Sequence, residues 1–427
     1  MSGRKRWSAW LFNASMLCYI LWLMLPAVQV RLRAVTGALT MAVFAAGILL
    51  DFEMFLKRWR DLVPRVLCVA ALPLLLMLFL NRGGDEAFGY YAQQVMFWFP
   101  LLWCAVAAQH ADQTSYRLVF AAMLLAFTVT TLTTIGWLIE GIFREEGRVY
   151  AYSRSLGDGS EGRQAYLNEL MGHNIGGYGF VYASMLALPV TFFLSRGKGW
   201  KRFAFGGLYL LQLIMIVLSQ YTYAIVFAAV ITAVELLGLL LRKLFRRLSV
   251  GGSLLCAVPL VALALLLRMP VVTGLQSLAE ALHFDTIAKN LGQLLGAMTG
   301  GGIAEGTRLE SYVTSLRSFF TSPVFGGIFS GQAQLGMHSE LLDMLAGIGI
   351  AGTAVFFAGV WLIGRGMGKG IKTSGLLPHL VLQWLALAAF MTLDTVFYAR
   401  EIPLVIALSI AFAVWTAHKK SDIMKSM

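Results

Sequence analysis

Long apolar runs recur along this chain and constrain its fold more than any other feature. Runs long enough to cross a bilayer lie near residues 9–28, 34–50, 66–80, 92–109, 118–139, 175–195, 203–219, 222–241, 250–268, 341–363, 379–396 and 402–417. About 20 apolar residues form one transmembrane helix, which pairs its own backbone polar groups in lipid. The sequence therefore predicts an all-α integral membrane protein with about twelve transmembrane helices.

Composition supports a single polytopic membrane domain over residues 1–427. The chain is 58% hydrophobic and only 13% charged, unlike an ordinary soluble protein. Its net charge of +12 does not indicate nucleic-acid binding, because basic and aromatic residues do not interleave. The four cysteines all fall in apolar runs, without the spacing of a disulfide framework or a metal site. We expect neither a metal nor another cofactor.

The charges of the loops predict the orientation in the membrane. Short basic loops alternate along the chain, and such loops stay in the cytoplasm. They contain Lys57, Arg58, Arg60 and Arg65, then Arg196, Lys198, Lys201 and Arg202, then Arg242, Lys243, Arg246 and Arg247, then Arg365, Lys369 and Lys372, and finally Lys419 and Lys420. Both termini are then cytoplasmic. The two longest loops, 140–174 and 269–340, fall on the extracytoplasmic side, which favours chemistry at that face.

The first of these loops has the composition of a sugar-binding segment. Arg163, Tyr166 and Asn174 represent its mixture of arginines, aromatic rings and amides. Rings can stack on sugar faces while polar groups bond the hydroxyls. The alternative is a solvated loop with interfacial tyrosines, in which Asn174 caps the next helix.

The second loop carries a sequence of local structural signals. A leucine-rich stripe over residues 275–294 predicts a short amphipathic helix on the membrane surface. A capping box formed by Thr307 and Glu310 then predicts a helix that begins near Arg308. This helix should end before Ser322 and Pro323, because the residue before a proline avoids the helical region.

A further helix start is predicted directly after His338. Ser339 is a favoured N-cap residue, and the acids Glu340 and Asp343 follow in the first turn, where the helix dipole stabilises them. This helix is one of the predicted membrane spans. His338 is therefore expected at the mouth of a membrane helix, where a neutral imidazole can accept a proton.

The segment from Arg308 to Gly352 resembles the signature of the O-antigen ligase and O-antigen polymerase (Wzy/WaaL-like) superfamily of polytopic membrane glycosyltransferases. The resemblance rests on Arg308, on Ser322-Pro323-Val324-Phe325-Gly326, on His338-Ser339 and on Gly349-Ile350-Ala351-Gly352. It implies that His338 is catalytic and that Arg308 binds a lipid diphosphate.

Other residues are weaker candidates for the same site. Arg268, Arg317 and Arg400 could also reach the diphosphate, or could instead extend to the membrane interface. The family usually carries an arginine between its seventh and eighth helices, where this chain has Ser219-Gln220-Tyr221-Thr222. Gln220, Tyr221 and Glu340 are candidates for binding the acceptor or its sugars.

The resemblance implies transfer of a glycan from an undecaprenyl-diphosphate-linked donor at the periplasmic or extracellular face of the bacterial inner (plasma) membrane. We expect polymerisation of surface polysaccharide repeat units, and the missing arginine favours this over ligation to lipid A-core or protein. The expected partners are the lipid-linked donor, a glycan acceptor, the lipid bilayer and a chain-length regulator. A transporter or flippase of lipid-linked oligosaccharides is the alternative from another class.

Overall fold

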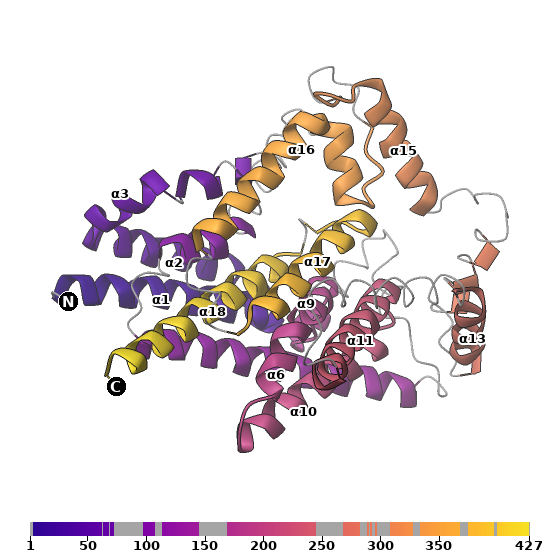
Figure 1. The fold of residues 1–427 in the computed structure, drawn as a ribbon, viewed down its shortest axis with the longest axis horizontal. Coiled ribbons are helices and arrows are strands. Elements are labelled where there is room, and N and C mark those ends of the chain that lie inside the picture. The colour runs from indigo at the N-terminus through magenta and orange to yellow at the C-terminus, as the bar shows by residue number, and fades with distance from the viewer. Residues whose placement is uncertain are drawn as a thin grey trace.

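The described part of the chain is helical, as the apolar runs predict. The computed structural model describes residues 3–61, 63–67, 69–71, 97–106, 113–144, 169–244, 268–281, 288–289, 291–292, 295–296, 308–327, 334–367, 375–396 and 399–426. Its longer helices (Figure 1) are α1 (Gly3–Met24), α2 (Pro26–Leu50), α3 (Phe52–Asp61), α6 (Gln113–Arg144), α9 (Tyr178–Ser195), α10 (Trp200–Leu218), α11 (Thr222–Leu244), α13 (Arg268–Ala281), α15 (Arg308–Thr321), α16 (Glu340–Met367), α17 (Leu377–Leu393) and α18 (Glu401–Ser426). Within these ranges no β-strand occurs, which agrees with the all-α class.

Several of these helices are long and apolar enough to cross a membrane. Six satisfy both conditions among the described residues, and α2 adds a seventh if its two halves, which meet at 93°, form one span. Phe97–Val106, Leu377–Leu393 and Glu401–Thr416 are shorter apolar helices. The chain is therefore a multi-pass membrane protein. The total of twelve spans remains a prediction, because most of 66–80 and nearly all of 250–268 lie outside the described residues.

Buried helices form the centre of the bundle and exposed ones its edge. Helix α9 packs against α10, α11, α17 and α18, and most of its side chains are buried. The Tyr182 ring stacks on Phe390 of α17 with centroids 4.2 Å apart. By contrast, α10 and α11 expose apolar side chains such as Leu210 and Val230. Such surfaces are stable against lipid tails, so these two helices form the edge of the bundle.

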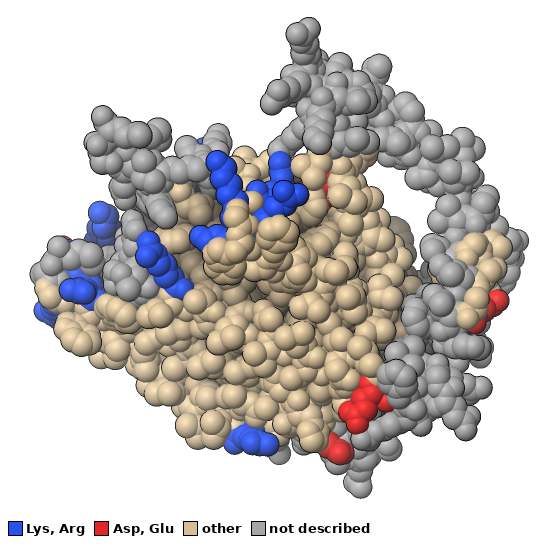
Figure 2. All heavy atoms as spheres, turned by 90° about the horizontal axis from the view of Figure 1, so that it is seen from below, with Lys and Arg blue, Asp and Glu red and all other residues tan. Residues whose placement is uncertain are grey.

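Charged residues are unevenly distributed over the face of the molecule that Figure 2 shows. On the face shown in Figure 2, Lys and Arg gather toward the end where both termini lie, and Asp and Glu toward the other. This separation is the pattern that the positive-inside rule describes. The cytoplasmic placement of the termini is still a prediction.

Helix α16 is broken at Gly349, and the turn at 322–327 fills the break. Gly349 has φ 65° and ψ −173°, so the ordinary bond from Ile350 N to the Ala346 carbonyl cannot form. Instead, Ile350 N donates to the Pro323 carbonyl (2.9 Å), and Gly327 N donates to the Ala346 carbonyl (2.8 Å). Ala351 N likewise donates to the Val324 carbonyl (3.0 Å), so the turn supplies bonds to the backbone groups around the break, as an apolar environment requires.

Glycine is needed on both sides of this contact. Gly326 also has a positive φ of 73°. A Cβ added at Gly349 would collide with the backbone of Val324 and Gly326, and one at Gly326 would collide with the backbone of Gly347 and Ile348. The glycines that carry much of the family resemblance therefore have a structural role here, since they let two backbones approach closely.

Candidate functional site at the start of helix α16

The start of α16 is tied to the link between α17 and α18. Glu340 N donates to the Asp394 carbonyl (3.2 Å), and the Glu340 carboxylate accepts a bond from Val396 N (2.9 Å). Tyr312 of α15 donates its hydroxyl to the Leu393 carbonyl (2.7 Å). The predicted site residue Glu340 is buried and bonded to backbone, so the structure places it as an anchor beneath the site surface.

Two serines of α15 hold the segment that precedes His338. Ser318 Oγ accepts a bond from Gln334 N (3.0 Å), and Ser315 Oγ accepts one from Gly336 N (2.9 Å). Ser315 in turn donates to the Asp343 carboxylate (2.6 Å). The site is thus connected from α15, through the segment 334–339, to the first turn of α16.

The backbone around His338 leaves little freedom to shift. A Cβ at Gly336 would overlap the Ser311 carbonyl, so glycine lets the segment lie directly on α15. Met337 adopts a positive φ of 59°, which is uncommon for a residue with a side chain. On the other side of His338, Asp343 N donates to the Ser339 carbonyl (2.9 Å). His338 is consequently fixed from both neighbours.

His338 itself lies at the N-terminus of α16, as predicted. Ser339 Oγ accepts a bond from Leu342 N (3.2 Å), which makes Ser339 the N-cap. The His338 side chain is partly exposed, and no hydrogen bond joins its ring to another described residue. The imidazole can therefore approach a ligand at the bundle end, where the helix dipole also favours negative charge.

The structure brings one of the four candidate arginines into a defined contact. The Arg400 guanidinium lies over the Trp22 ring, 5.6 Å from its centroid, so a cation–π contact joins the start of α18 to α1. Arg317 is exposed on α15. Arg308 and Arg268 are the first residues of α15 and α13, and their side chains lie outside the described part of the molecule.

The break between α10 and α11 lies near the same end of the bundle. Gln220 has φ 55° and is buried, and the buried Tyr221 ring packs near Tyr178 and Tyr182 with centroids 5.7 Å and 5.8 Å away. Tyr223, two residues on, has its hydroxyl 3.4 Å from that of Tyr312. The residues that follow the break thus adjoin α15 through a pair of tyrosines.

Asn174 connects the first long loop to its neighbours. Its Nδ2 donates to the hydroxyls of Thr130 (3.0 Å) and Thr133 (3.4 Å), and its Oδ1 accepts a bond from Ala27 N (3.5 Å). These bonds join the start of α2, α6 and the approach to α9. None of these partners of Asn174 belongs to α15 or α16, the helices next to His338. Arg163 and Tyr166 lie outside the described residues.

The serine face of α15 was not identified from the sequence. On this helix Leu316 and Phe320 are exposed, while Ser315 and Ser318 are buried. The available signal was the spacing of Ser311, Ser315 and Ser318 by four and then three residues. That spacing places three hydroxyls on one helical face.

Taken together, the arrangement presents one accessible imidazole on a rigid polar frame at an end of the bundle. In the described ranges, no three His, Cys, Asp or Glu side chains group closely enough to hold a metal ion. Comparison with known protein families and with curated proteins finds no match for the chain.

Proposed function

We propose that the chain is a membrane glycosyltransferase that uses a polyprenyl-diphosphate-linked sugar donor. The observation that carries this proposal is the position of His338, partly exposed at the N-terminus of a broken membrane helix and fixed through Ser315 and Asp343. Arg308 begins the neighbouring helix α15. One base and one cation beside a membrane surface suit transfer of a sugar from a lipid diphosphate.

The proposed reaction is a single displacement. His338 accepts the proton of an acceptor hydroxyl while that oxygen attacks the anomeric carbon of the donor. The bond from this carbon to the diphosphate oxygen breaks, and the electron pair leaves with the polyprenyl diphosphate. Arg308 stabilises the charge on the leaving group through its guanidinium donors. One displacement inverts the configuration at the anomeric carbon.

Within this class, we propose polymerisation of lipid-linked repeat units. The supporting feature is the Ser219–Thr222 step, which has no arginine where the resembling family usually places one. A ligase would instead transfer a finished glycan to lipid A-core or to a protein. Incubation of the purified protein with lipid-linked repeat units should give a product ladder. Transfer only to an acceptor without a polyprenyl chain would identify a ligase.

A transporter remains the alternative from another class, and one buried pair favours it. His379 Nδ1 of α17 lies 2.6 Å from the Glu235 carboxylate of α11, and both side chains are buried. Ionisable groups inside a membrane often mark transport paths. His379, however, is in the first turn of α17, at the opposite end from the Leu393–Val396 link to α16. The pair therefore lies away from the candidate site, and we favour a packing role.

The test is polymer formation by His338→Ala and Arg308→Ala variants in cells that lack the wild-type gene. We expect each variant to reach normal membrane levels, to accumulate unextended lipid-linked units and to lose at least 100-fold in polymer, which is typical for removal of a general base or a charge-stabilising donor. His173→Ala and Arg202→Ala are the matched controls. Full-length polymer from both site variants would reject the transferase proposal and favour the transporter.

A further inference from the structure

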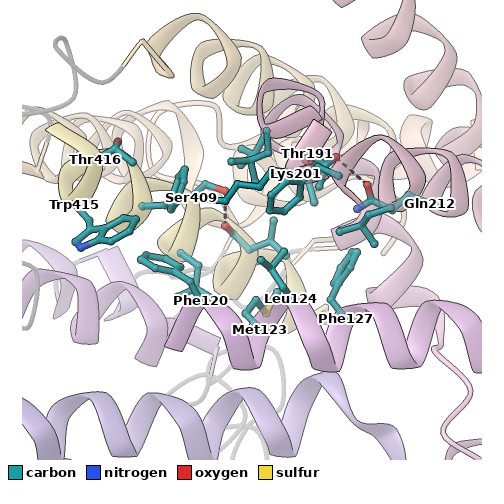
Figure 3. A pocket seen from close by; sticks show the side chains of 18 of the residues that line it. Phe120, Met123, Leu124, Phe127, Thr191, Lys201, Gln212, Ser409, Trp415 and Thr416 are labelled. Atoms are coloured by element: carbon teal, nitrogen blue, oxygen red, sulfur yellow. Dashed lines mark hydrogen bonds between the residues drawn. The ribbon is translucent and has the colours of Figure 1, made fainter. Parts of the chain in front are cut away.

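A large cavity lies between α6, α9, α10 and α18, separate from the start of α16 (Figure 3). Its volume is about 520 Å³, which falls within the range of about 300–1,000 Å³ usual for ligand sites. Aromatic and aliphatic side chains form most of the wall, including Phe120, Leu124, Phe127, Phe412 and Trp415. A wall of this kind suits a hydrocarbon chain.

The floor of the cavity has few polar groups, and among the polar atoms of Thr191, Gln212 and Ser409 only Gln212 Nε2 has no hydrogen-bond partner in the described part of the protein. Ser409 donates its hydroxyl to the Val405 carbonyl (2.7 Å). Thr191 donates its hydroxyl to Gln212 Oε1 (2.8 Å), and both of these side chains are buried. Because these bonds stay within the protein, the floor chiefly offers apolar contact.

The mouth of the cavity differs from the floor in charge and exposure. Trp200 and Lys201 line the cavity and are also exposed, Trp200 to 74%. They belong to a basic segment, residues 196–202, whose exposed cations are Arg196, Lys198, Lys201 and Arg202. Exposed tryptophans and cations are typical of the level of lipid headgroups.

We infer that this cavity is a binding site for an anionic phospholipid of the surrounding membrane. One acyl chain occupies the apolar cavity, and the phosphate lies at the mouth beside Lys201. Charge complementarity selects an anionic over a zwitterionic headgroup, since Lys201 of the basic segment 196–202 lines the cavity. The lipid site is independent of the proposed transfer reaction, because none of its lining residues belongs to α15 or α16.

The test measures lipid retained by the full-length protein purified in mild detergent, by native mass spectrometry with added dioleoylphosphatidylglycerol or dioleoylphosphatidylcholine. We expect the wild type to retain the phosphatidylglycerol preferentially. Leu124→Trp fills the cavity and should lower retention at least fivefold. Leu125→Trp, at the next position and 68% exposed, should retain lipid as the wild type does.

Lys201→Gln gives a second measurement that does not disturb the core. It should weaken binding of phosphatidylglycerol about fivefold, as expected for one surface lysine. Binding of phosphatidylcholine should not change, and Lys57→Gln, at an exposed lysine of α3 outside the basic segment 196–202, should behave as the wild type. Equal retention of both lipids by the wild type would overturn the proposal. So would unchanged phosphatidylglycerol binding in Lys201→Gln, or preferential retention of a polyprenyl phosphate.

Discussion

At the residue scale, the position of His338 depends on side chains that would not themselves touch a substrate. Ser315 connects Gly336 N to the Asp343 carboxylate, and Asp343 N donates to the carbonyl of Ser339, the residue after His338. Positioning of this kind raises a rate because a catalytic group must stay within a fraction of an ångström of its productive place.

Ser315→Ala should therefore affect both stability and transfer. Loss of the hydroxyl leaves Gly336 N and the Asp343 carboxylate each without one bond, which should cost about 1–3 kcal/mol. We expect a lower midpoint of thermal unfolding in detergent and reduced polymer formation. Thr314→Ala is the matched control, because Thr314 donates only to the Glu310 carbonyl of its own helix (3.0 Å). Equal effects of the two substitutions would show that the Ser315 bonds do not position the site.

At the element scale, the interrupted helix α16 and the turn at 322–327 form one unit. At the break, the Ala346 carbonyl accepts its bond from Gly327 N of the turn, and Ile350 N donates its bond to the Pro323 carbonyl of the turn. The helix and the turn therefore complete each other's backbone hydrogen bonds. An interruption of this type is stable in a membrane only where other protein backbone fills it. The break also directs the first two turns of α16, and with them His338, toward α15.

Gly349→Ala should disrupt this unit. The added Cβ meets the backbone of Val324 and Gly326, and alanine disfavours a φ of 65°. We expect a loss of about 3 kcal/mol or more in stability and low levels of folded protein, measured by size-exclusion chromatography and thermal unfolding. Gly364→Ala lies in the same helix with open space around the new Cβ, so it should change stability by less than about 1 kcal/mol. A Gly349→Ala protein as stable as Gly364→Ala would contradict the interpretation.

At the scale of the whole molecule, the two ends of the bundle differ in charge and in structure. One end carries the basic segment 196–202, whose Lys201 lines a cavity together with Thr416 of α18, and the other carries the start of α16, which is bonded to Val396 before α18 begins. The separation predicts that the basic end faces the cytoplasm. The candidate catalytic site would then face the outside, where a lipid-linked donor is available and nucleotide-activated donors are scarce.

Cysteine labelling tests this orientation. After replacement of the four natural cysteines by alanine, an impermeant maleimide should label Gln334→Cys in intact spheroplasts. It should label Lys198→Cys only after permeabilisation. Both positions are exposed on the folded protein, so a difference in labelling would report the side of the membrane and not burial of the side chain. The reverse pattern would place His338 inside the cell and exclude the proposed donor geometry.

Patterns in the sequence were sufficient to predict the helical class, the membrane setting and helix boundaries around the site. Apolar run length predicted most described helices, the capping box predicted the start of α15 at Arg308, and Ser322-Pro323 predicted its end. Ser339 was likewise predicted as an N-cap from its residue type and the acids that follow it, and its hydroxyl accepts the bond from Leu342 N. These features depend on hydrogen bonds and torsion preferences within a few residues, so a local pattern can reveal them.

The way in which these helices and turns pack together depends on tertiary contacts. The break of α16 at Gly349, the insertion of the 322–327 turn and the serine face of α15 all depend on contacts between segments more than fifteen residues apart. A glycine or serine in the sequence does not specify which backbone lies against it. The cavity between α6, α9, α10 and α18 has the same origin, because its wall exists only once four separate helices have packed.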